Sequence, residues 1–365
     1  MSRDLSDGAR GAKCSERGDE INVKDDSYNY GLSLLRSLIC FGVILLHFRG
    51  GGGRFLAPFS YVARISVPCF MFLSFFLVEK HIIVWDVDFV KKRMWRIVYP
   101  WIVWAFIYWC TLKTLEVLFC INYQIRFSDL FWQLFTGHSS KLNSAMWFQF
   151  DLAVLTVLYL CLFRLSKRVI LTCTLFGIAL GMQYSGINSW LFGGLRYELK
   201  YPLGRLCEMI PYASLGLISA YFGIYQIPQR VCRRLPKLSR FLLILIMSIC
   251  VTFLMTHSVI KAAPGFMYSV NNNIPIVLLV VGVAYLLPVK ALHENFLHSI
   301  KFATRYTLGI YCMHILVGKV LGLLFLRCGV DVNKFMFCIM IYGVCFGISF
   351  LLSHISKTFL GALVE

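Results

Sequence analysis

Long apolar runs, separated by short polar segments, recur along most of the chain. Each has about the length that a helix needs to cross the hydrocarbon core of a membrane. The pattern predicts an all-α fold, a polytopic transmembrane helical bundle of about ten helices. The weakest spans are 168–184, with its glycines and polar end, and 274–288, which is short and contains prolines. The predicted spans are 32–48, 59–79, 97–119, 146–163, 168–184, 209–225, 240–256, 274–288, 306–326 and 335–355.

Composition and charge agree with a membrane protein and orient the chain. Hydrophobic residues make up 58% of the 365 residues and charged residues 15%, which excludes an ordinary soluble domain. Lys and Arg concentrate in one alternate set of loops, so the positive-inside bias predicts that both termini are cytoplasmic. The net charge of +18 follows mainly from this bias, and no nucleic-acid partner is implied.

The domain organisation is simple. Residues 1–28 are polar, mixed in charge and without an apolar core, so we expect a disordered cytoplasmic tail and no cleavable signal. Residues 29–365 are expected to form one transmembrane domain surrounded by membrane lipids. The 14 cysteines are scattered, with no CxxC pair, and no metal site is indicated.

The first apolar run carries two ionisable side chains, Arg36 and His47, where lipid makes such groups costly. The two residues are about 16 Å apart along a helix and close to three full turns, so they share one stripe of its surface. A guanidinium near one membrane face and an imidazole near the other suit a reaction that crosses the bilayer. We predict that this stripe is the centre of the active site.

Charged side chains also mark the third predicted span. The segment 91–96 (KKRMWR) is basic, and Arg93 and Arg96 are one turn apart, a spacing that can grip an anionic ligand from one side. Such clusters also serve as topology charges and headgroup anchors, so both interpretations stay open. Lys113 and Glu116 are spaced to form a salt bridge.

Six short motifs follow one another along residues 30–355. They are Arg36 with His47, 66–74 (SVPCFMFLS), Arg93 with Arg96, Trp147-Phe148, 204–208 (GRLCE) and 308–314 (LGIYCMH). In this order they resemble the acyltransferase-3 family of integral membrane O-acyltransferases, which acylate cell-surface glycans. One position departs from the family, because Phe75 follows Ser74 where glycine is usual.

The resemblance implies a donor, an acceptor and a reaction. The donor is an acyl-CoA, with acetyl-CoA as the expected one, held from the cytoplasm by Arg93 and Arg96. His47 is essential for transfer. The expected function is that of a membrane O-acetyltransferase in a bacterial inner membrane. It would acetylate a surface or lipid-linked glycan, such as a lipid-linked polysaccharide, on the outer side.

The chemistry assigned to His47 takes one of two forms. The imidazole acts as a general base toward the acceptor hydroxyl, or as a nucleophile that forms a transient acyl-imidazole. A carboxylate or a carbonyl usually orients such a histidine. The carboxylate candidates are Asp151 and Glu208, and Glu208 is preferred because family members often carry an acid there.

A donor arm extended from Arg36 toward His47 predicts a tunnel between the two membrane faces. Tyr311 and His314, one turn apart in the ninth predicted span, are expected to contact the substrate in this tunnel. For His314, a structural or tunnel-lining hydrogen bond is favoured over a role as a second base.

A transporter or flippase for a lipid-linked glycan is the main alternative, because it would share the spans and the intramembrane Arg and His. It would not need an arginine pair placed for a nucleotide, and no duplicated halves are visible. A receptor or assembly subunit would leave the stripe of Arg36 and His47 unexplained. The acceptor sugar and the oligomeric state, including a homo-oligomer, stay open.

Overall fold

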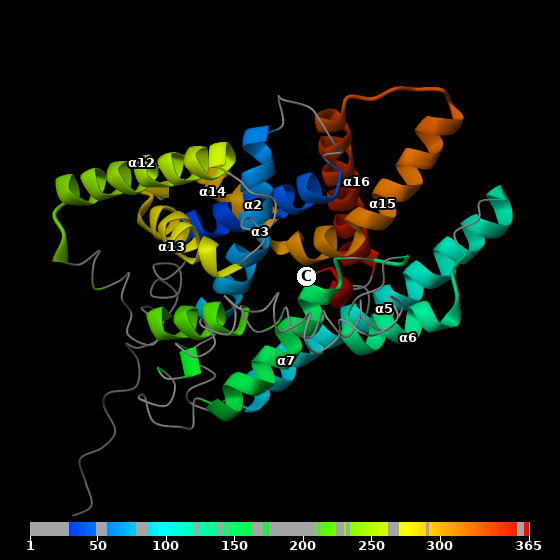
Figure 1. Ribbon diagram of the computed structural model, residues 1–365, viewed down its shortest axis with the longest axis horizontal. Coiled ribbons are helices and arrows are strands. Elements are labelled where there is room, and N and C mark those ends of the chain that lie inside the picture. Colours follow the sequence, from blue (N-terminus) through cyan, green and yellow to red (C-terminus); the bar gives the residue numbers. More distant parts are fainter. Residues whose placement is uncertain are drawn as a thin grey trace, which may run out of the picture.

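The computed structural model is helical over most of the residues it describes, and no strand occurs among them (Figure 1). It describes residues 29–48, 57–77, 87–120, 124–137, 141–143, 145–162, 171, 173–174, 209, 212–223, 230, 234–261, 270–289, 292–355 and 361–364. The helices are α2 (Tyr30–Phe48), α3 (Ala57–Phe76), α5 (Val87–Phe119), α6 (Phe127–Thr136), α7 (Trp147–Leu162), α12 (Lys237–Lys261), α13 (Val270–Leu286), α14 (Glu294–Arg305), α15 (Thr307–Arg327), α16 (Lys334–Ile355) and the short η4 (Gly361–Leu363).

The prediction of an all-α bundle is confirmed. Within the described ranges, α2, α5, α15 and α16 are long and apolar enough to cross a membrane. Shorter apolar helices lie at Ile65–Phe76, Trp147–Leu162, Leu238–Val251 and Ile274–Leu286. Large apolar side chains are exposed on the outside of the bundle, a property expected of surfaces that contact lipid. On α12 they include Phe241, Leu242, Leu245, Ile246 and Ile249.

The structure differs from the predicted spans in a few places. α5 begins at Val87, ten residues before the predicted 97, because its first turns are too polar to register as an apolar run. The helices α6 and α14 were not predicted, since both are short and α14 is largely polar. The predicted tail 1–28 and nearly all of the span 168–184 lie outside the described residues, and the side of the membrane for the termini stays a prediction.

The helix α2 is the centre of the bundle. It packs against α3, α13, α14, α15 and α16, most extensively against α3. Figure 1 shows α2 and α3 crossing, with α12 and α13 to the left and α15 and α16 to the right. The buried side chains Ile39, Val43 and Ile44 place α2 in the apolar core. The helix that carries Arg36 and His47 therefore packs against five of the other helices that the structure describes.

The start of α2 is fixed by a cap and by a close approach to α13. Asn29 accepts a hydrogen bond from the backbone N–H of Leu32 at 2.9 Å, as an N-cap residue does, and donates to the backbone oxygen of Tyr285 at 3.2 Å. At Gly31 a Cβ would overlap the backbone oxygen of Ala284. Only glycine fits between the two helices here.

Substitution of Gly31 by alanine is expected to destabilise the fold by about 1–3 kcal/mol, because the added methyl group overpacks a contact with backbone. Thermal unfolding of the detergent-purified protein measures the effect. Gly343→Ala in α16 is the matched control. Nothing lies within 4 Å of that position, so alanine there should be neutral or slightly stabilising. Equal stability of the two variants would contradict the close approach.

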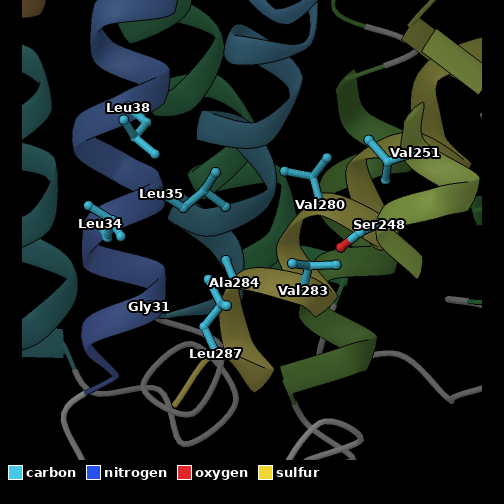
Figure 2. Close-up of a pocket in the computed structure, with 10 residues that line it drawn as sticks. All are labelled: Gly31, Leu34, Leu35, Leu38, Ser248, Val251, Val280, Val283, Ala284 and Leu287. Atoms are coloured by element: carbon cyan, nitrogen blue, oxygen red, sulfur yellow. The ribbon is translucent and has the colours of Figure 1, made fainter. Parts of the chain in front are cut away.

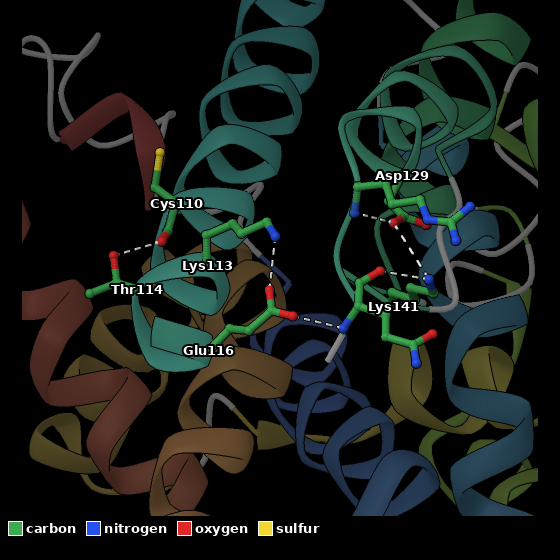
Figure 3. Close-up of polar contacts among 8 residues, drawn as sticks. Cys110, Lys113, Thr114, Glu116, Asp129 and Lys141 are labelled. Carbon is green, nitrogen blue, oxygen red and sulfur yellow. Dashed lines mark hydrogen bonds and ion pairs between the residues drawn. The ribbon is translucent and has the colours of Figure 1, made fainter. Parts of the chain in front are cut away.

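A polar network joins the end of α5 to α6 and the segment after it (Figure 3). Lys113 Nζ lies 2.9 Å from Glu116, which confirms the predicted salt bridge, and Glu116 also accepts from the backbone N–H of Gln124 at 2.9 Å. Lys141 donates to the Gln124 backbone oxygen at 2.7 Å and lies 3.9 Å from Asp129. The network fixes the segment around Lys141 next to α5.

The turn η4 packs into the bundle against α5 and α16. The Trp104 indole of α5 donates to the backbone oxygen of Leu363 at 3.3 Å. The backbone N–H of Gly309 in α15 donates to the oxygen of Val364 at 3.0 Å, and Val364 is fully buried. This segment is thus part of the core beside the start of α15.

Candidate active site

Two imidazole rings, His47 at the end of α2 and His314 in α15, lie beside each other. Their ring centres are 5.2 Å apart, although the residues come from opposite ends of the chain. His314 is fully buried, whereas His47 is partly exposed. Next to them the ring of Phe48 lies against Gly318, where a Cβ would overlap that ring. The close approach of α2 and α15 at Gly318 therefore places the two imidazoles together.

The hydrogen bond at Nδ1 of His314 indicates which nitrogen of the neutral ring carries the proton. Nδ1 lies 2.6 Å from the backbone oxygen of Tyr311. A carbonyl oxygen only accepts hydrogen bonds, so Nδ1 donates and Nε2 carries the lone pair. Nε2 is buried and has no hydrogen-bond partner among the described residues. The ring beside His47 therefore holds a buried, unsatisfied acceptor.

Tyr311 connects this turn of α15 to neighbouring elements. Its ring centre lies 6.3 Å from that of Phe70 in α3 and 5.3 Å from that of Phe148 in α7. Its hydroxyl donates to the backbone oxygen of Ala145. The ring centres of Tyr311 and His314 are 5.7 Å apart. Tyr311 thus lies beside the imidazole pair, while its contact with substrate stays a prediction.

The Tyr108 hydroxyl of α5 hydrogen-bonds to the backbone of α15 in the turn that contains His314. Its hydroxyl donates to the oxygen of Cys312 and accepts from the N–H of Leu316, both at 2.9 Å. In an undisturbed helix these two backbone groups bond to each other. Asn143 also donates to the Cys312 oxygen at 3.5 Å, and Gln149 Nε2 donates to the Cys312 sulfur at 2.9 Å. Side chains from α5, α7 and the segment before α7 therefore shape this turn.

The other basic candidates are Arg36, on the first half of α2, and Arg93 and Arg96 in α5. Arg93 Nε lies 3.4 Å from the Thr156 hydroxyl, and its guanidinium carbon is 5.4 Å from the centre of the Phe75 ring. Its Nη2 is buried and has no hydrogen-bond partner in the part of the chain that the structure describes. Arg96, one turn further along α5, is exposed.

The predicted site residues thus fall into separate places. His47 lies with His314 and Tyr311. Arg36 is on the first half of α2, Arg93 has a buried nitrogen, and Arg96 is on the surface. Asp151 is buried in α7, and Glu208 lies outside the described residues. Sequence reasoning missed Tyr108, Asn143, Gln149 and Cys312. In the described ranges no three His, Cys, Asp or Glu side chains are placed to hold a metal ion.

An apolar cavity of about 280 Å³ opens between α2, α12 and α13 (Figure 2). Gly31, Leu34, Leu35 and Leu38 form its wall on α2, and Ser248 is the polar side chain among its lining residues. At about 100° per residue, these positions lie mainly on the side of α2 away from Arg36. The cavity is therefore separate from the predicted tunnel, which stays a prediction.

Comparison with known families decides the class of the protein. A family model described as an acyltransferase domain matches residues 29–354. The chain belongs to the acyltransferase 3 family. No curated protein and no solved structure matches it. The matched range includes all of the predicted site residues, and family membership together with the apolar helices makes the protein an integral, multi-pass membrane acyltransferase.

Proposed function

We propose that this acyltransferase 3 protein moves an acetyl group from cytoplasmic acetyl-CoA to a hydroxyl of a surface or lipid-linked glycan on the outer side of a bacterial inner membrane. The observation that carries the proposal is the placement of Arg36 and His47 at two levels of α2. Arg36 lies on its first half, and His47 lies at its end beside His314. Family membership favours an enzyme over a transporter or flippase.

The guanidinium of Arg93 is suited to bind an anionic ligand. One guanidinium nitrogen of Arg93 is buried without a partner among the described residues. An unsatisfied buried donor costs about 1–3 kcal/mol, and more when it is charged. Phosphate oxygens satisfy a guanidinium with two parallel bonds. CoA carries phosphates at its nucleotide end, and we propose that exposed Arg96 meets them from the surface.

The position of His47 supports acyl transfer at the thioester end of the donor. Arg36 and His47 are about 16 Å apart along α2, and we propose that the thin arm of CoA spans this separation. His47 takes the proton of the acceptor hydroxyl while its oxygen attacks the thioester carbonyl. A C–O bond forms, the C–S bond breaks, and the CoA thiolate takes up the proton. An acyl-imidazole on His47 gives the same products in two steps.

Membrane vesicles that contain the protein test this proposal. Acetyl-CoA labelled in its acetyl group is supplied to the cytoplasmic face, and vesicles without the protein are the control. We expect label in the polysaccharide or lipid-linked glycan fraction, with an equal amount of free CoA thiol. Movement of a lipid-linked glycan with no loss of thioester would overturn the proposal and favour a transporter.

A further inference from the structure

We infer that His314 positions His47 for the reaction: Nε2 of His314 accepts a hydrogen bond from a ring N–H of His47, so the other His47 nitrogen faces the acceptor hydroxyl. The inference rests on the proposed function, in which His47 is the base. In this inference the neighbouring imidazole of His314 orients His47. From the sequence, that role is predicted for a carboxylate, Glu208 or Asp151.

The separation of the two rings fits this hydrogen bond. Two imidazoles joined by an N–H···N bond have ring centres about 5 Å apart, which is a bond of about 3 Å plus about 1 Å from each ring centre to its nitrogen. The observed separation is 5.2 Å, with the planes tilted by 46°. The last side-chain torsion of histidine is broad, and in the inferred geometry the His47 ring turns about it to meet Nε2 of His314.

The tautomer of the neutral His314 ring leaves Nε2 as a hydrogen-bond acceptor, as the inference requires. Nδ1 donates to the Tyr311 oxygen at 2.6 Å, which leaves the lone pair on Nε2. Nε2 has no partner in the described residues, although it is buried. A histidine with only a packing role would satisfy both nitrogens, because a buried unsatisfied polar group costs about 1–3 kcal/mol. The unsatisfied lone pair therefore points to a partner, and the ring beside it is that of His47.

Exposure decides which histidine meets the substrate. His314 is 0% exposed, whereas His47 is partly exposed at the end of α2. An acceptor hydroxyl therefore reaches His47, and His314 acts through it. When His47 gains the proton, its positive charge is stabilised along a chain of two hydrogen bonds that ends at the Tyr311 carbonyl.

The elements around His314 hold it in one orientation. The Tyr108 hydroxyl bonds to the backbone on both sides of this residue, at Cys312 and Leu316. On the facing helix, Phe48 packs against Gly318. A positioning residue needs such support, because a catalytic group must be held within a few tenths of an ångström of its working geometry.

Steady-state kinetics of His314 variants with acetyl-CoA and the native membrane glycan test the inference. We expect His314→Leu to lower kcat by about 10- to 100-fold with little change in the KM for acetyl-CoA, as loss of an orienting partner does. His314→Gln should recover part of the loss, because its amide oxygen accepts a hydrogen bond. Thermal unfolding checks each variant, and His314→Met replaces the leucine variant if that protein does not fold.

His354 provides the matched control. It lies in α16, contacts the oxygen of Phe350 through Nδ1 at 3.1 Å and is exposed. His354→Leu should leave both kcat and KM unchanged. The inference fails if His314→Leu keeps the wild-type kcat, if His314→Gln loses as much as His314→Leu, or if KM rises as the rate falls. Absence of transfer by the wild-type protein would instead reject the proposed function, and this inference with it.

Discussion

His47→Ala is expected to lower kcat for acetyl transfer by about 10²- to 10⁴-fold, which is the usual contribution of a general base. The KM for acetyl-CoA should change little, because the nucleotide end is proposed to bind near Arg36 and Arg93. His47→Gln should be equally slow, since an amide forms hydrogen bonds but does not take up a proton at neutral pH. The measurement is release of CoA thiol together with acetylation of the glycan.

Binding of acetyl-CoA provides the control for these variants. Calorimetry with the purified proteins should give the same affinity for wild type and for both His47 variants, which separates a lost base from a lost fold. The assignment is wrong if folded His47→Ala protein transfers acetyl groups at the wild-type rate.

Arg93→Gln is expected to weaken the binding of acetyl-CoA by about 10- to 150-fold, which corresponds to the 1.5–3 kcal/mol of a hydrogen bond to a charged group. Arg93 is the member of the basic segment with a buried nitrogen left unsatisfied among the described residues. Arg93→Lys should recover only part of the affinity, because lysine keeps the charge and loses the planar fork that matches a phosphate.

Lys92→Gln is the matched control, because Lys92 directly precedes Arg93 in the same helix and is exposed. Its loss should change the affinity less than threefold at moderate salt, since exposed charges are screened by ions and water. Equal effects of Lys92→Gln and Arg93→Gln would show that the donor responds to overall charge, and would reject a specific site at Arg93.

Hydropathy could predict the membrane-crossing helices and little else of the fold. The first span, predicted at 32–48, forms α2 from Tyr30 to Phe48, and the last, predicted at 335–355, forms α16 from Lys334 to Ile355. The two short helices α6 and α14 were not predicted. In α14 (Glu294–Arg305) charged and polar side chains alternate with a few apolar ones, so no apolar run appears.

Helical periodicity could have separated Arg93 from Arg96. The buried stripe of α5 recurs every three to four residues at Ile97, Pro100, Trp104, Tyr108 and Leu112. Extended back by four residues the stripe reaches Arg93, whereas Arg96 lies about 100° to the side. The same stripe includes Tyr108, whose contact with α15 no local pattern predicts.

The contact between His47 and His314 could not be predicted from the chain, because it depends on how α2 packs against α15. Each histidine stands alone in its own apolar run. Their pairing follows from Gly318, where the absence of a side chain admits the ring of Phe48. One glycine inside a helix does not show which partner helix it admits.

The buried position of η4 bears on how the protein is prepared. Val364 is fully buried, and its oxygen is bonded to Gly309, five residues before His314 in α15. A foreign segment joined directly after Val364 would pull on this contact and disturb the helix that carries the buried imidazole. Tags for purification and for the assays above therefore belong away from this turn.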